Sequence, residues 1–196
     1  RFTAIRAAAL AASALWVTLL PAAAQIGSGY ALAFGGVNDY VLPPTLLFET
    51  VSNTFTMELW VNPTASRAAT TETTSGITGI AGQRYAIFPA HGNEFGVTNT
   101  TGAGISVGTN GVSVFEHADG FLPSPLVTNV TLTNWTHVAV VYSNGLPRLY
   151  LNGALVRTGL RTGTTVHPSA YLRDYFGQNY GFFQGQLDEV RIWDGV

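Results

Sequence analysis

Aromatic and charged side chains recur at the two-residue spacing of a β-strand in several parts of this chain. Over residues 55–61, apolar and polar residues alternate, so the polar ones share the face opposite the apolar ones. By the same two-residue spacing, Arg148, Tyr150 and Asn152 share one face of residues 148–152, and Leu187, Glu189, Arg191 and Trp193 share one face of residues 185–193. Aromatic rings stack on the C–H faces of sugars, and carboxylate and guanidinium groups bind sugar hydroxyls. The pattern therefore predicts a glycan-binding surface made of six side chains: Glu58, Trp60, Tyr150, Glu189, Arg191 and Trp193.

A structural role for the same side chains is the alternative. Large aromatic residues are mostly buried, and charges beside them are usually paired. Trp60 and Trp193 would then pack under a loop, beside an internal ion-pair cluster of Glu58, Glu189 and Arg191. If the strand alternates without a break, Leu187 lies on the same face as Glu189 and Arg191. One β-bulge would reverse which residues share a face.

Catalytic spacing is missing from the sequence. Glycosidases that use a carboxylate nucleophile and a carboxylic acid need both groups to face one substrate. Asp188 and Glu189 are adjacent, so they point to opposite faces of a strand. The four histidines lie at positions without metal-ligand spacing: His91, His117, His137 and His167. We therefore expect no enzyme. Glu116 and His117 end a predicted strand beside a long loop, where they contact a ligand or cap the turn.

The first residues have the pattern of a secretory leader. Two arginines precede the apolar stretch 7–20, and Pro21 to Ala24 supplies small residues for cleavage before Gln25. The stretch is shorter than the roughly 20 apolar residues that span a bilayer, so we expect no stable membrane insertion after cleavage. The sequence predicts a signal-peptide helix at 1–24, a bacterial protein that is secreted or at the cell surface, and a single domain at 25–196.

Composition limits the partners of that domain. The chain has nine basic residues, all arginine, against eleven acidic ones, and two of the arginines lie in the leader. The remainder is therefore acidic, which argues against a nucleic-acid partner. The chain has no cysteine, so disulfides are excluded and a large core or bound ions must supply the stability. Because the last residues directly follow a predicted strand, we also expect other domains of a parent protein.

Short runs of strand formers separated by glycine, asparagine and proline indicate an all-β fold. Residues 135–158 predict a three-strand meander with turns at Ser143 to Gly145 and at Asn152-Gly153. A hairpin is predicted around Asn110-Gly111, and the glycines of the surrounding segment 104–117, Gly104 included, are predicted to make tight hairpins. Long loops are expected at 64–76, 117–125 and 159–169, the first of them mobile. This spacing is typical of a sandwich or jelly roll.

Four segments, in order, resemble the laminin-G-like, concanavalin A-type jelly-roll domains. They are an opening strand at Phe34 to Val41, a second strand at Phe55 to Val61, a central hairpin at Asn134 to Gly153 and a closing strand at Gly185 to Trp193. The resemblance implies two antiparallel sheets packed face to face, with the first and last strands adjacent. It also implies an extracellular role in glycan or protein recognition.

The resemblance also implies a structural calcium ion between the opening segment and the closing strand. The matching oxygen donors are Asn38, Asp39 and Asp188, whereas Gly35 stands where the family often has aspartate. The function expected is a secreted, non-catalytic recognition module that binds a glycan or a glycosylated surface. The alternative is a structural or adhesive spacer that binds protein partners.

Overall fold

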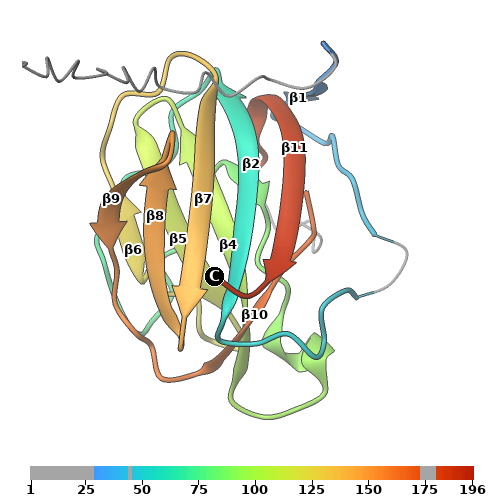
Figure 1. The fold of residues 1–196 in the computed structure, drawn as a ribbon, viewed down its shortest axis with the longest axis vertical. Helices are drawn as coiled ribbons and strands as arrows, with labels where there is room; N and C mark the ends of the chain where they lie inside the picture. The colour runs from blue at the N-terminus through green and yellow to red at the C-terminus, as the bar shows by residue number, and fades with distance from the viewer. Residues whose placement is uncertain (1–28, 44–45, 173–179) are drawn as a thin grey trace, which may run out of the picture.

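Two β-sheets pack face to face in the structure, a computed structural model that describes residues 29–43, 46–172 and 180–196 (Figure 1). The six-stranded sheet has the order β1 (Leu32–Gly35), β11 (Gln184–Asp194), β2 (Phe55–Pro63), β7 (Thr136–Ser143), β8 (Leu146–Leu151) and β9 (Ala154–Thr158). The five-stranded sheet has the order β10 (Thr165–Pro168), β4 (Thr100–Gly108), β5 (Gly111–His117) and β6 (Leu126–Thr128), with β3 (Tyr85–Ile87) also paired to β4. The predicted all-β jelly-roll sandwich is confirmed.

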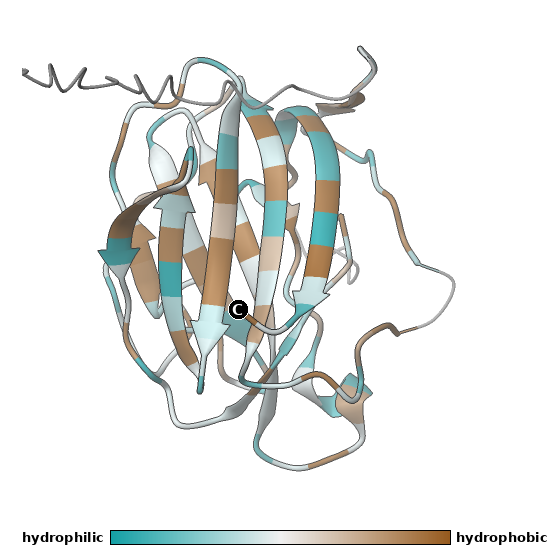
Figure 2. Cartoon of the chain, viewed as in Figure 1, coloured by the Kyte–Doolittle hydropathy of each residue, from teal (hydrophilic) through white to brown (hydrophobic). Residues whose placement is uncertain are grey.

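The main core lies between the two sheets. Along β2, Phe55, Met57, Leu59 and Val61 are completely buried, whereas the residues between them are only partly buried. Figure 2 shows this alternation as brown and pale bands along β2 and β7. These apolar side chains meet those of β4 and β5, so the hydrophobic effect fixes the register of the sandwich.

Local turn chemistry places the predicted hairpins correctly. In the meander, Asn152 and Gly153 both have positive φ, as a type I′ turn requires. The β4–β5 hairpin pairs Gly108 with Gly111 across its turn. β1 pairs with β11, so the first and last strands are adjacent as expected. Every strand pair is antiparallel except β10 with β4, which is parallel.

A second core covers the outer face of the five-stranded sheet. It contains Tyr85, Phe88, Ala90, Phe115, Leu122 and Tyr171. On that face β4 presents Gly102, Gly104 and Gly108, and a Cβ on any of them would lie 2.1–2.4 Å from the backbone of a covering loop. The prediction that Gly104 makes a tight turn is therefore wrong. It lies within a strand, where a missing side chain lets the loop approach.

Residues 64–76 were predicted to be mobile but lie tied to the five-stranded sheet. The buried guanidinium of Arg67 donates to the backbone carbonyls of Ala68, Val112 and Thr128. Its backbone also exchanges two hydrogen bonds with the Asn110 side chain. The composition of this segment predicted a solvated loop. It could not reveal these hydrogen bonds, because their partners lie far away in the chain.

The opening strand is shorter and earlier than the motif Phe34 to Val41 predicts. After Gly35 the backbone turns at Gly36, which has φ 81°, and the Asp39 carboxylate accepts a hydrogen bond from Gly35 N–H. A side chain that accepts a main-chain donor in this way replaces the ladder partner and ends the strand.

The predicted leader at 1–24 lies outside the described residues. Within the part of the chain that the structure describes, no helix is long and apolar enough to cross a membrane.

Candidate functional site

The predicted surface residues gather around Glu58 on the outer face of the six-stranded sheet. The Glu58 carboxylate accepts a hydrogen bond from Trp193 Nε1 at 2.9 Å and lies 3.2 Å from His137 Nε2 and 3.9 Å from an Arg191 nitrogen. Arg191 also pairs with Glu189. The outer face therefore carries both the aromatic side chains and an ion-pair cluster.

The remaining predicted members lie beside this cluster. Trp60 contacts the His137 ring, with 5.3 Å between ring centroids. Tyr150 lies on β8, separated from Glu58 by Ala139 of β7, which pairs with both residues. Trp193 is 53 % exposed, so it does not pack under a loop. A glycan-binding role for this surface stays a prediction.

The parity assumed for β11 is wrong because the strand contains a bulge. Glu189 has φ 52°, and the pairing with β2 shifts between Asp188 and Arg191. Leu187 therefore lies in the core opposite Val61, while Arg191 lies on the outer face opposite Glu58. The extra residue of a bulge inverts the side-chain alternation beyond it.

Two of the three predicted calcium ligands accept local backbone hydrogen bonds. Asp39 accepts from Gly35 N–H, and Asp188 accepts from Glu189 N–H at 2.8 Å. Among the described residues, no group of three His, Cys, Asp or Glu side chains could hold a metal ion. A calcium ion on Asn38, Asp39 and Asp188 would thus need backbone carbonyls as additional ligands.

Calcium binding by these residues stays a prediction with a direct thermal test. A bound ion stabilises only the folded chain, so excess EGTA should lower the melting temperature and added calcium should restore it. Magnesium-loaded buffer serves as the control. A melting curve that EGTA leaves unchanged would contradict the prediction.

A pocket of about 560 Å³ lies at one end of the five-stranded sheet, and none of the six residues of the predicted glycan-binding surface lines it. It is lined by His91, Asn93, Glu94, His117, Ala118, Asp119, Gly120 and Tyr180. A volume in this range, about 300–1,000 Å³, is usual for small-ligand sites. Three parts of the chain supply the lining: the turn after β3, the end of β5 with its following loop, and Tyr180, which precedes β11.

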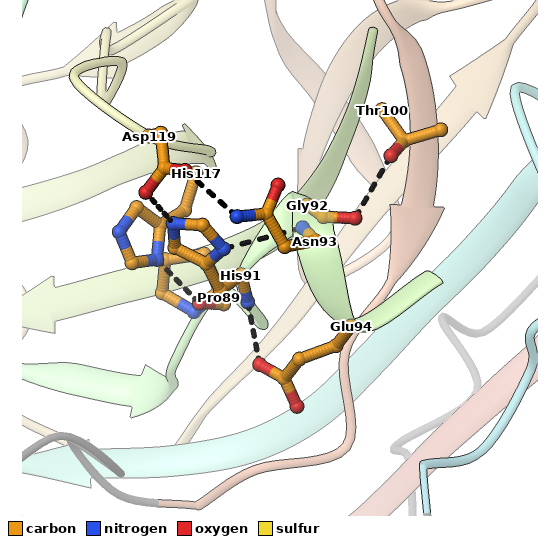
Figure 3. Close-up of polar contacts among 8 residues, drawn as sticks. All are labelled: Pro89, His91, Gly92, Asn93, Glu94, Thr100, His117 and Asp119. Atoms are coloured by element: carbon orange, nitrogen blue, oxygen red, sulfur yellow. Dashed lines mark hydrogen bonds and ion pairs between the residues drawn. The ribbon is translucent and has the colours of Figure 1, made fainter. Parts of the chain in front are cut away.

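The short helix η1 (Gly92–Phe95) positions the first of these segments. His91 caps it: the ring accepts from Asn93 N–H, and the Glu94 carboxylate accepts from His91 N–H at 2.8 Å. A Cβ on Gly92 would lie 2.0 Å from Thr100 O, so only glycine permits this approach to β4. Thr100 Oγ1 donates to Gly92 O, which holds the turn against the strand (Figure 3).

Asp119 is held in one orientation at the rim of the pocket. One carboxylate oxygen accepts from Asn93 Nδ2 at 2.7 Å, and the other lies 3.0 Å from His91 Nε2 (Figure 3). Because His91 Nδ1 accepts a backbone N–H, Nε2 carries the proton and donates to Asp119. The hydrogen bond from Asn93, with the neighbouring His91, holds the pKa of Asp119 below its ordinary value.

That carboxylate keeps capacity for a ligand. Its side chain is 80 % exposed although both oxygens have a protein donor. An ionised carboxylate offers about four acceptor positions, so positions for further donors remain on its solvent side. The arrangement is a fixed negative acceptor open to solvent.

His117 is a neutral side chain in the pocket wall. Its Nδ1 lies 3.2 Å from Pro89 O, and because a carbonyl only accepts, Nδ1 carries the proton. Burial lowers the pKa of His117 to about 4, so the ring is uncharged at neutral pH. Its Nε2 is then an acceptor.

Aromatic rings surround these polar groups. The His117 ring packs edge-on against His91, with 4.7 Å between centroids, and lies 5.9 Å from Tyr180. Phe88 of the second core lies 5.9 Å from both His117 and Tyr180. The pocket therefore combines an apolar aromatic side with fixed polar acceptors.

The sequence of the whole domain identifies its family. The family model described as the concanavalin A-like lectin/glucanases superfamily matches residues 34–196. The chain belongs to this superfamily. The match covers every strand from β2 to β11 and agrees with the observed two-sheet sandwich. No curated protein matches this superfamily member in sequence.

Three solved structures illustrate the likeness in fold. Domain 4 of AbnA, an extracellular GH43 arabinanase from Geobacillus stearothermophilus solved with arabinotriose, is 17 % identical over 82 % of this chain and 77 % of that chain, with a TM-score of 0.42. Carbohydrate binding module CBM66 from Bacillus subtilis is 12 % identical over 86 % and 94 %, with a TM-score of 0.45. Domains LG4-5 of the mouse laminin α1 chain are 13 % identical over 88 % and 47 %, also with a TM-score of 0.45. These values concern the fold alone.

Sequence reasoning missed most of the pocket in this concanavalin A-like domain. It singled out His117 at the end of β5, but as one residue beside Glu116, which points the other way into the core. The useful signal is the run His91-Gly-Asn-Glu, in which a capping residue precedes an acidic residue by three positions. Its proximity to Asp119 and Tyr180 depends on the packed loops and has no local signature.

Proposed function

We propose that this domain is a non-catalytic, extracellular carbohydrate-binding module that binds a neutral sugar in the pocket between His91, Asp119 and Tyr180. The observation that carries the proposal is a fixed, ionised and exposed carboxylate beside aromatic rings. Sugars present hydroxyl donors around their edge and apolar C–H groups on their faces, and both would be matched here. As a binding appendage, the module would hold a larger parent protein on a glycan.

Charge in the pocket favours a neutral sugar over an acidic one. Asp119 and Glu94 both line it, and His117 is uncharged at neutral pH. A carboxylate or sulfate group on the ligand would be repelled by the acidic side chains.

The state of the two carboxylates that line the pocket, Asp119 and Glu94, supports sugar binding rather than sugar hydrolysis. A glycosidase needs a carboxylic acid that stays protonated to donate to the leaving group. The pKa of Asp119 is lowered, which disfavours that role. Both Glu94 oxygens accept hydrogen bonds within the wall, from His91 N–H at 2.8 Å and Tyr171 OH at 2.6 Å.

We expect the substitution Asp119→Ala to lower sugar affinity by at least about tenfold, because it removes the charged acceptor of the pocket. A glycan array on the chain identifies the sugar, and isothermal titration calorimetry measures the affinity. Asp194→Ala, at an exposed carboxylate that ends β11, is the matched control and should leave the affinity unchanged.

Two further outcomes separate the alternatives. If Trp60→Ala abolishes binding while Asp119→Ala does not, the sugar binds on the outer face around Glu58, and the pocket is not the site. If no glycan binds and the chain self-associates in light scattering, the carbohydrate proposal fails and a structural or adhesive spacer is supported.

A further inference from the structure

A second hollow adjoins the pocket. It has a volume of about 350 Å³ and shares Asn93, Ala118 and Asp119 with the first. The rest of its lining comes from residues 97–101, from Phe121 and from Thr164. The hydrogen bond from Asn93 Nδ2 to Asp119 Oδ2 belongs to the boundary between the two hollows, so the Asp119 carboxylate borders both.

The second hollow differs from the first in chemistry. Apart from Asp119, its lining has no charged side chain and is dominated by threonine hydroxyls and asparagine amides. Such groups both donate and accept hydrogen bonds, as sugar hydroxyls do. Val97 is 59 % exposed, and together with Phe121 it supplies apolar surface for a C–H face.

The wall of this hollow is held in place before any ligand binds. Asn99 has φ 58°, and its carbonyl accepts from Thr165 N–H at 2.9 Å. Thr101 and Thr164 share a hydrogen bond of 2.8 Å between their hydroxyls. Thr100 Oγ1 lies within hydrogen-bond distance of both Val97 O and Gly92 O. A preorganised wall lowers the entropic cost of binding.

We propose that the two hollows are adjoining subsites, and that the module binds a linear neutral oligosaccharide with one sugar unit in each. This inference rests on the proposed function and goes beyond it in assigning the second subsite and the chain-like ligand. Asp119, at the shared boundary, accepts hydroxyls from both units. The ligand class is therefore a neutral oligosaccharide of at least two units.

The test compares ligand lengths by calorimetry, using the mono-, di- and trisaccharide of the sugar found by array. The intact chain should bind the disaccharide at least about tenfold more tightly than the monosaccharide, because a second unit adds contacts without a second loss of translational freedom. The double variant Thr98→Ala/Asn99→Gly should lose this gain and keep the monosaccharide affinity. Glycine at 99 retains the left-handed backbone while removing the amide.

The control is Thr133→Ala/Asn134→Gly, which alters an exposed Thr-Asn pair in the loop before β7. It should leave both affinities unchanged. The second subsite would be contradicted if the intact chain bound sugars of all three lengths with equal affinity. It would also be contradicted if the Thr98/Asn99 variant still bound the disaccharide more tightly than the monosaccharide. Neither result would contradict the first subsite. If no length of sugar binds, the proposed function itself fails.

Discussion

The substitution Gly102→Ala should lower the free energy of unfolding by about 3 kcal/mol, which corresponds to roughly 6–12 °C in melting temperature for a domain of this size. The added Cβ would lie 2.1 Å from Ala90 O and 2.8 Å from Ala90 N. Both contacts are with backbone, which cannot rotate away as a side chain can. Either β4 or the segment before η1 must move.

The same displacement should reach the proposed sugar-binding pocket. His91 directly follows Ala90, and its ring holds Asp119. We therefore expect Gly102→Ala to weaken sugar binding although residue 102 does not line the pocket. Thermal unfolding and calorimetry on one preparation measure the two effects.

Gly120→Ala is the control for backbone strain without a clash. Gly120 has φ 62° and nothing within 4 Å of an added Cβ. Left-handed strain alone costs about 1 kcal/mol. If Gly102→Ala is no more destabilising than Gly120→Ala, the close approach of the loop to β4 is not a constraint on the fold.

Glu116 should make the stability of the domain fall between pH 5 and pH 8. Its carboxyl is fully buried between the sheets, where it accepts hydrogen bonds from the hydroxyls of Tyr142, Thr162 and Thr164. Burial raises the pKa of Glu116 to about 7, and these hydrogen bonds only partly offset that rise. Burial also raises the pKa of Tyr142 well above its ordinary value, so its hydroxyl stays a donor.

The sign follows from proton linkage. Because the folded chain holds this proton more tightly than the unfolded chain, the stabilisation is fully present below pH 4.5, the ordinary pKa of the group. It is lost as the pH rises through about 7. At about 1.4 kcal/mol for each pKa unit, the loss between pH 5 and pH 8 is about 2–3 kcal/mol.

The variant Glu116→Gln isolates this contribution. Glutamine keeps the shape, and the three hydroxyls can rotate to suit its amide. The difference in free energy of unfolding between the variant and the intact chain should shift by about 2–3 kcal/mol in favour of the variant between pH 5 and pH 8. Denaturant unfolding at each pH measures it. Parallel pH curves for the two proteins would show that Glu116 does not titrate in this range.

Elements that depend on local pattern and turn chemistry could be predicted from the sequence. The alternation along β2 and the turns at Asn144-Gly145 and Asn152-Gly153 were sufficient, because side-chain period and left-handed backbone preference act within a few residues. Four such segments in order also indicated the family. The pairing of β1 with β11 followed from that resemblance and not from any local feature.

The sequence-based predictions were wrong where a single residue changes the side of the strand on which all later side chains lie. The bulge at Glu189 leaves Leu187 in the core and Arg191 on the outer face, and its mark in the sequence is the three-residue step between the apolar residues Leu187 and Val190. In β4, Gly104 was predicted to make a tight turn. Glycine is required there instead because a loop packs on the strand, and that packing depends on contacts far apart in the chain.

By itself, the sequence determined the all-β class and the alternating faces, because both are properties of neighbouring residues. Only the tertiary structure decided which polar groups meet: His91, Asp119 and Tyr180 come from three separate segments that the second core packs together. A binding pocket is made by loops, and the positions of loops depend on long-range packing rather than on period or propensity. Six predicted surface residues therefore remain one candidate site, and the packed loops supply another.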